Sequence, residues 1–341
     1  MIRLDAATVA RLTGGEIIGG DPAKASERVS IDSRSIVPGD CFVAIVGPRD
    51  DGHRYAQRTL ASGAAMLILQ RQSIVEHLVN PTGAAIIRVT DTTAALQDLA
   101  RHARDTVNPV VIAITGSVGK TTTKTLTHAL IRATRKTHAT PGNFNNRWGL
   151  PLSLLGLAAD DGWMVAELGL SAAGEIGALT RLARPEIGVI TNVSPVHMEN
   201  FDSLGGVAAA KRELAEGLPP NGTLIVNADD PRTAAIGVEM SGRVAQGITF
   251  GRTAAADVAA DGTRPADSGW HFDLRFPGQS PVAVHLPLPG EHSIANFLAA
   301  AAVAHALGIG STTVAARAAA LSLPPMRGQI HRTPAGVIRR P

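Results

Sequence analysis

The sequence predicts an α/β protein of two domains, of which the second is built on a mostly parallel sheet flanked by helices. The chain has 341 residues, and 45% of them are hydrophobic, which is enough for two separate cores. In its second part, short runs of continuous apolar residues alternate with helical segments, a pattern typical of parallel strands buried on both faces. Aromatic residues make up only 3%, and the abundant small apolar residues suit close packing of helices on a sheet.

Residues 1–107 are predicted to form the first domain, an α/β unit. An amphipathic helix that ends at a glycine pair is followed by a strand, a turn at Pro38–Gly39 and a second strand. A helix, two buried strands and a long helix capped by Asp91 or Thr92 complete this domain. The expected elements are a helix at 5–15, strand, turn and strand over 29–47, a helix at 53–64, strands at 65–70 and 84–90, and a helix at 91–107.

Residues 108–325 are predicted to form the second domain, in which each parallel strand is followed by a helix. The expected strands are 110–115, 163–170, 187–193 and 223–229, and the expected helices are 120–133, 174–184, 204–217 and one near Pro231. Alternating residues separated by Gly and Pro predict a small antiparallel insert within 257–289. Two alanine-rich helices are expected after it, at 293–308 and 311–322.

Composition and charge exclude several classes of protein. The net charge is +3 and no Lys/Arg-rich block marks a nucleic-acid-binding tail, so we expect no nucleic-acid partner. Cys41 is the single cysteine, which excludes a disulfide framework and a cysteine-based zinc site within one chain. The N-terminus lacks the apolar core of a signal peptide, and no stretch approaches the roughly 18 apolar residues of a membrane span. We therefore expect a cytoplasmic protein without a membrane span.

A glycine-containing loop between a predicted strand and a predicted helix is the clearest functional signal. Such a loop directs backbone N–H groups toward one point, where the N-terminus of the helix adds partial positive charge. Lys120 can reach the β- and γ-phosphates of a nucleotide, and the Thr121 hydroxyl can ligate Mg²⁺. The general pattern G-x-x-x-x-G-K-[ST] is not met, because Ile114 stands where its first glycine belongs. The predicted nucleotide-binding residues are Gly116, Ser117, Val118, Gly119, Lys120, Thr121 and Thr122.

The alternative for this loop is an ordinary strand-to-helix turn with a solvated lysine. The sequence GKTTTK directly after a buried apolar strand disfavours that alternative.

Polar residues near the ends of later strands are candidates for the same site. Glu167 falls at the C-terminal end of a buried strand, where ligands bind in open α/β sheets. A buried carboxylate needs a cation, which is either Mg²⁺ or the partner in a structural salt bridge. His197 follows the next strand in a loop and is either a metal ligand or a surface histidine. Lys211 lies in a predicted helix, where a lysine is usually solvated. Its position in the sequence alone therefore does not mark it as a functional residue.

Side-chain amides mark two further segments. Asn143, Asn145 and Asn146 lie in one polar loop, where they either bind a ligand or simply form turns. His292 and Asn296 are spaced i, i+4 on one helix face, and the alternative there is capping or chance.

Taken together, these segments resemble the Mur ligases, the ATP-dependent amide-forming enzymes of peptidoglycan precursor synthesis. The short loop of that family, G-x-x-G-K-[ST], is similar to residues 116–121, which explains the departure from the general pattern. The segment 31–55 resembles the UDP-sugar-binding N-terminal domain of the family. The segments similar to the member that adds D-alanyl-D-alanine are 140–146, 167–218, 227–231 and 290–304.

The resemblance implies roles for individual residues. Lys120 and Thr121 match the phosphate-binding lysine and the magnesium-ligating threonine, and Glu167 and His197 match further magnesium ligands. Lys211 matches a lysine that is carbamylated in most members, which turns a cation into a metal ligand. The implied catalytic residues are Lys120, His197 and Lys211; the implied adenine contacts are His292 and Asn296; and the implied substrate-binding residues are Ser33, Arg34 and His53, beside Asp32, together with Asn143, Asn145 and Asn146.

The implied reaction uses ATP and Mg²⁺ to join D-Ala-D-Ala to UDP-MurNAc-tripeptide through an acyl phosphate. Residues 326–341 are expected to begin a linker to a C-terminal domain that this chain lacks, so we expect weak activity or none from the chain alone. The full-length protein is expected to be a monomer. The open alternatives are a non-catalytic module that binds nucleotide and UDP-sugar, and a related ligase that adds a single amino acid.

Overall fold

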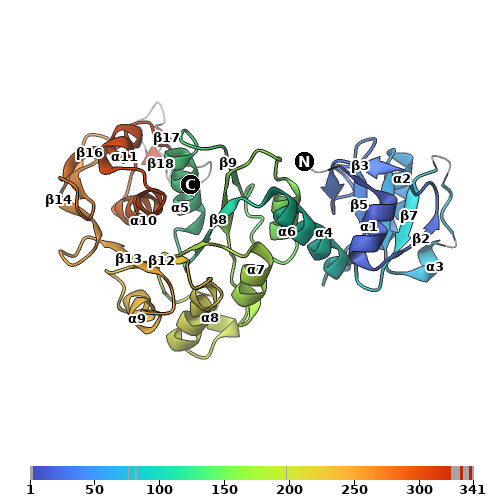
Figure 1. Ribbon diagram of the computed structural model, residues 1–341, viewed down its shortest axis with the longest axis horizontal. Coiled ribbons are helices and arrows are strands. Elements are labelled where there is room, and N and C mark those ends of the chain that lie inside the picture. The colour runs from blue at the N-terminus through green and yellow to red at the C-terminus, as the bar shows by residue number, and fades with distance from the viewer. Residues whose placement is uncertain are drawn as a thin grey trace. The chain divides into compact units, whose positions relative to one another are not determined.

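The structure, a computed structural model, describes residues 3–75, 77–80, 83–196, 198–323, 331–332 and 338–339 (Figure 1). The chain forms two compact units. The first contains residues 1–108 and 147–161, and the second contains residues 109–146 and 162–341. The first unit thus includes a segment, 147–161, that lies beyond the sequence-predicted boundary at residue 107. Each unit is described below by itself.

The first unit is organised around a five-stranded sheet in the order β2-β7-β6-β5-β4, counted among the described residues. Strands β4 to β7 are parallel, whereas β2 pairs antiparallel with β7. The strands are β2 (Glu16–Gly19), β4 (Val29–Ser30), β5 (Cys41–Val43), β6 (Met66–Leu69) and β7 (Ala85–Arg88), with β1 (Leu4–Asp5) and β3 (Ala25–Ser26) in a separate antiparallel pair.

Helices enclose this sheet, and α4 packs against both α1 and α6. The side chain of Asp91 caps α4, accepting hydrogen bonds from the backbone N–H groups of Thr93 and Ala94 at 2.7 and 3.2 Å. The core of the unit contains Phe42, Leu60 and Leu67, which are fully buried. The helices are α1 (Ala6–Thr13), η1 (Gly52–Tyr55), α2 (Ala56–Ala61), α3 (Gln72–Val75), α4 (Thr92–Val107) and α6 (Gly149–Leu155).

The strand, turn and strand expected over 29–47 contain β4 and β5, which run parallel to each other. Parallel neighbours require a crossover, and residues 31–40 supply it as a loop rather than as a helix.

The second unit contains one large sheet, which has nine strands among the described residues, in the order β16-β15-β14-β13-β12-β11-β8-β10-β9. The strands from β9 to β14 are parallel, and β14, β15 and β16 pair antiparallel. The predicted mostly parallel sheet with a small antiparallel insert is therefore confirmed. The strands are β8 (Val110–Thr115), β9 (Thr137–Ala139), β10 (Trp163–Glu167), β11 (Ile187–Ile190), β12 (Thr223–Asn227), β13 (Gln246–Gly251), β14 (Val258–Ala266), β15 (Gly269–Arg275) and β16 (Val282–Leu286).

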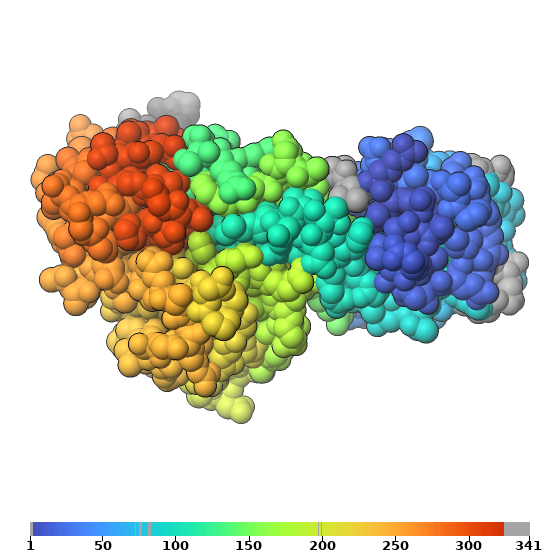
Figure 2. Space-filling model, viewed as in Figure 1, coloured from blue at the N-terminus to red at the C-terminus, as the bar shows by residue number. Residues whose placement is uncertain are grey.

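Helices cover both faces of this sheet. Helices α5 and α10 contact each other and the sheet on one side, with α11 beside them, while α7, α8 and α9 lie on the other side (Figure 1). The space-filling view shows the red segment of α10 and α11 packed against the green segment that contains α5 (Figure 2). Helix α10 is apolar on almost all sides because it is buried between α5 and the sheet. The helices are α5 (Lys120–Ile131), α7 (Glu175–Ala183), η2 (Met198–Asn200), α8 (Leu204–Glu216), α9 (Pro231–Glu239), α10 (His292–Ala306) and α11 (Ser311–Ala318).

Two remaining features concern the ends of the sequence and the membrane. Short strands β17 (His331–Arg332) and β18 (Ile338–Arg339) pair antiparallel, and the rest of the predicted linker 326–341 lies outside the described residues. Within the part of the chain that the structure describes, no helix has both the length and the apolar character needed to cross a bilayer.

Candidate active site

The candidate site lies at the carboxyl edge of the large sheet in the second unit. Strand β8 is the neighbour of both β10 and β11, and all three are parallel. Their C-terminal ends therefore lie side by side, which is where open α/β sheets bind ligands. The loop after β8 carries Lys120 at its end, β10 ends at Glu167, and the residues after β11 contact the loop.

Two glycines allow the loop after β8 to approach its neighbours closely. Gly116 has φ +150°, and a Cβ there would lie 1.9 Å from Thr191 Oγ1. Gly119, the N-cap of α5, has φ +86°, and a Cβ there would lie 2.3 Å from Asn296 Oδ1. Any side chain at either position would displace these neighbours, so glycine is required by both space and backbone conformation.

The segment after β11 holds the loop through a series of hydrogen bonds. The Ser117 N–H donates to Asn192 O and the Val118 N–H donates to Asn192 Oδ1, both at 3.0 Å. Thr191 Oγ1 donates to Val118 O at 2.8 Å. The N–H groups of Ser117 and Val118 therefore point into the protein. The N–H groups of residues 120–122 remain available to bind an anion, because the first turn of a helix has no carbonyl acceptors for them within the helix.

Lys120 folds back over the loop that precedes it. Its Nζ donates to Gly116 O at 2.8 Å and to Ser117 O at 3.3 Å. The ammonium is thereby held beside the N-terminus of α5, where Thr121 and Thr122 are half-buried. The cation and the helix end together create a region of positive potential.

Glu167 is a buried carboxylate, 2% exposed, with its two oxygens in different environments. Its Oε1 accepts a hydrogen bond from Asn145 Nδ2 at 2.8 Å. Its Oε2 lies 3.3 Å from Lys124 Nζ, an ion-pair distance, but lacks hydrogen-bond geometry to any described residue. Of the three loop asparagines, the structure thus brings Asn145 to the site, whereas Asn143 and Asn146 are exposed.

Lys211 is fully buried on α8. Its Nζ has no hydrogen-bond partner among the described residues. Burial, and secondly the charge of Lys120, lower the pKa of Lys211 to about 7. A buried, unpaired ammonium is costly, so this side chain is suited to an uncharged or chemically modified state.

These groups fit a hard cation in part. Buried orphan atoms are rare in folded proteins, and Glu167 Oε2 and Lys211 Nζ are two of them. Oxygen donors such as a carboxylate and the Thr121 hydroxyl are what Mg²⁺ prefers. Among the described residues, no three His, Cys, Asp or Glu side chains converge on one point, and His197 lies outside the described residues.

The two predicted adenine contacts, both near the N-terminus of α10, lie in different environments. Asn296 is 7% exposed, lies against Gly119, and has its Oδ1 3.4 Å from Thr123 Oγ1. His292 begins α10, is exposed, and has its ring beside Gly290. The structure therefore brings Asn296, but not His292, against the phosphate loop.

The first unit contains a separate cavity of about 660 Å³. Asp32, Ser33 and Arg34 line it, and the guanidinium of Arg34, 2.8 Å from Asp32 Oδ2, lowers the pKa of Asp32 to about 2. The cavity is also lined by residues that sequence reasoning missed, among them Arg49, Tyr55, Arg58 and Trp148.

His53 does not line this cavity. It is 1% exposed, its Nδ1 lies 2.7 Å from Asp51 Oδ1, and its Nε2 accepts from the Gln70 N–H at 2.9 Å. Both ring nitrogens are thus engaged inside the unit. The structure places His53 in the core, as a link between the loop at 51 and the end of β6.

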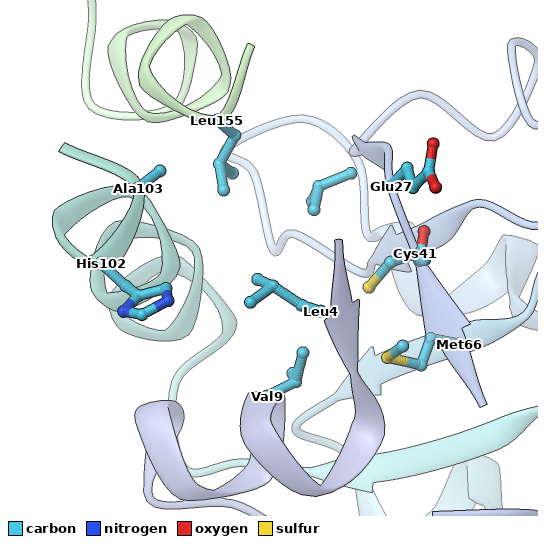
Figure 3. Close-up of a pocket in the computed structure, with 10 residues that line it drawn as sticks. Leu4, Val9, Glu27, Cys41, Met66, His102, Ala103 and Leu155 are labelled. Carbon is cyan, nitrogen blue, oxygen red and sulfur yellow. The ribbon is translucent and has the colours of Figure 1, made fainter. Parts of the chain in front are cut away.

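A second cavity in the first unit is far smaller, about 10 Å³, which is room for about one water molecule. Figure 3 shows Leu4, Val9, Ala103 and Leu155 around it, with the sulfur atoms of Cys41 and Met66. It is a packing gap between helices and sheet, not a ligand site.

A phosphate-binding loop, a buried carboxylate and a buried lysine at one sheet edge define a nucleotide-dependent enzyme of the α/β class. Comparison with known proteins narrows this class. The Mur ligase middle domain matches residues 114–304, and the catalytic domain of the Mur ligase family matches residues 26–104. The chain belongs to the Mur ligase family, and it is an ATP-dependent carbon–nitrogen ligase of that family.

Two curated relatives carry the same name. The UDP-N-acetylmuramoyl-tripeptide–D-alanyl-D-alanine ligase of Escherichia coli is 36% identical over 97% of this chain and 70% of the relative. The enzyme of the same name from Bacillus subtilis is 33% identical over 91% of this chain and 65% of the relative. The chain thus spans about two thirds of the length of these relatives.

Solved structures agree on the fold. MurF from Acinetobacter baumannii has a TM-score of 0.88 at 30% identity, covering 98% of this chain and 72% of that one. MurF from Thermotoga maritima, in complex with ADP, has a TM-score of 0.78 at 28% identity, covering 90% and 69%. The fold class and family predicted from the sequence are therefore confirmed.

Proposed function

We propose that this chain binds ATP, Mg²⁺ and UDP-MurNAc-tripeptide and adds D-alanyl-D-alanine to the tripeptide. One observation carries the proposal: Glu167 Oε2 and Lys211 Nζ are buried without hydrogen bonds in the unit that carries the phosphate loop. The names of the relatives support the choice of substrates, and the ADP complex of the Thermotoga maritima structure supports the nucleotide.

The chemistry proceeds in two displacements. A carboxylate oxygen of the tripeptide attacks the γ-phosphorus of ATP, a new P–O bond forms, and the bond to ADP breaks. The amine of D-Ala-D-Ala then attacks the acyl carbon, phosphate leaves, and the nitrogen loses a proton to give the amide. Lys120 and the first turn of α5 hold the phosphates and stabilise their charge, so positioning and electrostatics are the main contributions of the protein.

Thr121 and Glu167 are the described residues proposed to hold Mg²⁺, together with His197, which lies outside the described residues. When bound, Mg²⁺ neutralises charge on the transferring phosphoryl group. Glu167 has Lys124 beside it, and Lys120 adds a second cation, so these side chains alone supply little net negative charge for a divalent ion.

Carbamylation of Lys211 supplies the missing anion in this proposal. Attack of the uncharged amine on CO₂ forms an N–C bond, releases one proton and leaves a carboxylate-like group. The complete burial and unpaired Nζ of Lys211 favour such a modification over a free ammonium. Intact-mass measurement in bicarbonate buffer, with Lys211→Arg as the control, tests for the added mass.

The cavity of the first unit is the proposed site for the UDP-sugar. Its volume, about 660 Å³, lies within the range of small-molecule sites. Tyr55 and Trp148 offer aromatic faces, and Arg34, Arg49 and Arg58 offer cationic groups suited to a diphosphate. Ser33 lines the cavity as well, whereas the buried His53 does not.

A phosphate-release assay tests the function. Supplied with ATP, Mg²⁺, UDP-MurNAc-tripeptide and D-Ala-D-Ala, the chain is expected to release phosphate weakly, and only when all four are present. Binding of nucleotide and UDP-sugar without release, at enzyme concentrations that allow detection of one turnover, would instead support the non-catalytic module. Release with UDP-MurNAc-dipeptide and a diamino acid, but not with D-Ala-D-Ala, would support the amino-acid-adding ligase. The Escherichia coli relative, run in parallel, provides the reference rate.

A further inference from the structure

Lys124 is a buried lysine that belongs neither to the predicted phosphate-binding loop nor to the predicted metal ligands. It lies on α5 one turn after Lys120 and is 4% exposed. A buried ammonium persists only where it is paired and hydrogen-bonded. Its Nζ donates to Gly142 O at 2.6 Å and lies 3.3 Å from Glu167 Oε2, so both of its partners belong to the candidate site or to the loop beside it.

The same loop reaches Glu167 at two further points. Thr140 Oγ1 accepts from the Glu167 N–H at 3.2 Å, and Asn145 Nδ2 donates to Glu167 Oε1 at 2.8 Å. In addition, the Gly169 N–H donates a hydrogen bond to Asn145 O at 2.7 Å. Residues 140–146 are thereby attached to the end of β10 on both sides of the carboxylate, and Lys124 attaches the loop to α5.

The geometry leaves Glu167 with one oxygen fixed and the other available. Oε1 accepts a hydrogen bond from Asn145, whereas Oε2 has the Lys124 ammonium 3.3 Å away but no hydrogen bond among the described residues. Turning the carboxylate would break the Asn145 bond and move negative charge away from Lys124. The side chain is consequently held in one orientation, with Oε2 as the oxygen that remains able to accept a metal ion.

We propose that Lys124 is a positioning residue for the metal ligand: it joins α5, the 140–146 loop and Glu167 so that Glu167 Oε2 stays oriented for Mg²⁺. This inference rests on the proposed function, because it takes Glu167 to be a magnesium ligand. Loss of a group that orients a metal ligand typically lowers metal affinity by about 10- to 100-fold. Lys124 acts through Glu167 and through the loop, and it takes no part in the reaction.

The test is the magnesium dependence of ADP binding, measured by calorimetry in EDTA and in Mg²⁺, for the chain and its variants. Lys124→Met is expected to reduce the affinity gained from Mg²⁺ by about 10- to 100-fold, the usual effect of losing a group that orients a ligand. ADP binding in EDTA is expected to change little, because the substitution leaves Lys120 and the phosphate loop, residues 116–121, untouched. The matched control is Lys136→Met, an exposed lysine just before β9, which is expected to leave both affinities unchanged.

A double-mutant cycle separates positioning from general destabilisation. Glu167→Gln alone is expected to remove the magnesium dependence, and adding Lys124→Met to it is expected to cause no further loss, because Lys124 acts through Glu167. Equal weakening of ADP binding in EDTA and in Mg²⁺ by Lys124→Met would mean a merely structural role and would overturn the inference. Should Lys124→Met fail to fold, Lys124→Gln, which keeps an N–H donor but loses the charge, replaces it in the same cycle.

Failure of the two proposals gives different results. If the chain without substitutions shows no magnesium-dependent ADP binding, the proposed function is wrong. The proposed role of Lys124 is then wrong as well. If the chain without substitutions binds ADP in a magnesium-dependent way and Lys124→Met retains this dependence in full, only the proposed role of Lys124 is wrong.

Discussion

At the scale of single residues, Gly116 shows how tightly the phosphate loop is packed. A methyl group at this position would lie 1.9 Å from Thr191 Oγ1, which donates to Val118 O. We expect Gly116→Ala to lower the free energy of unfolding by about 1–3 kcal/mol, since overpacking forces neighbours to shift. Urea denaturation measures the loss, and ADP binding should weaken with it.

The control for this prediction is Gly242→Ala, which has a positive φ, +80°, but nothing within 4 Å of its Cβ. It is expected to lose about 1 kcal/mol, from backbone strain alone. Partial rescue by Thr191→Ala in the Gly116→Ala background would confirm the contact, and an unaffected Gly116→Ala protein would contradict it.

Cys41 is a second residue with a sharp expectation. Burial raises the pKa of its thiol to about 12. At pH 8 the thiol is therefore protonated, and iodoacetamide, which reacts with the thiolate, should leave the native protein unmodified over hours. Mass spectrometry should detect one added group only after unfolding in urea. Rapid alkylation of the native protein would show that the gap in Figure 3 opens in solution.

Asp32 in the larger cavity offers a test by titration. Hydrogen bonds from Arg34 lower the pKa of Asp32 to about 2. Because the folded-state pKa is depressed, the interaction is present above the ordinary carboxyl pKa and is lost as the pH falls toward 2. Arg34→Ala should raise the pKa of Asp32 toward its unperturbed value of about 3.9, but not fully, because the backbone N–H of residue 34 still donates to Asp32 Oδ1. Carbon-detected NMR titration measures it, and an unchanged low pKa would assign the shift to another donor.

At the scale of elements, α4 depends on its N-cap. Asp91 accepts from Thr93 N and Ala94 N, so Asp91→Ala is expected to cost about 0.5–2 kcal/mol of stability. Asp98→Ala, on the exposed side of the same helix, is the matched control and should cost less, because its ion pair with Arg101 lies at the surface. Thermal unfolding followed by circular dichroism measures both. Equal losses would mean that the cap contributes no more than a surface charge.

The contrast between elements also shows how far sequence reasoning reaches. Strands β8, β10 and β11 are continuous apolar runs, so their existence and parallel pairing follow from composition and from the helices between them. The direction of β4 against β5 does not follow, because a ten-residue segment rich in turn formers is compatible with either a hairpin or a crossover. The proximity of Glu167 to the phosphate loop follows once the strands are parallel.

Other parts of the site depend on long-range packing that leaves little local signal. Trp148 lines the cavity of the first unit although it lies 41 residues beyond residue 107, the predicted boundary of that unit. Asn192 resembles any loop asparagine until the loop that it holds is known. Lys124 was detectable in principle, because it is spaced i, i+4 from Lys120 on one helix face, but a lysine in a helix usually indicates solvent.

At the scale of the whole molecule, the two units have separate cores and separate proposed ligands. Each ligand should stabilise the unit that binds it, by about 2.7 kcal/mol at a concentration one hundred times its Kd. We expect calorimetry to show Mg·ADP raising the melting temperature of the second unit, and UDP-MurNAc-tripeptide that of the first. Lys120→Ala should abolish the shift with Mg·ADP and leave the shift with UDP-MurNAc-tripeptide. A single transition that either ligand raises would mean that the two units melt as one.

The bonds from Thr191 and Asn192 to the phosphate loop have a kinetic consequence. A loop that is already closed on its own protein does not need to be ordered by the nucleotide, so binding is spared that loss of conformational entropy. Association should then be close to a simple docking event, with a single phase whose rate rises linearly with nucleotide concentration. The segment after β11 that supplies these bonds holds the phosphate loop in its binding conformation before the nucleotide arrives.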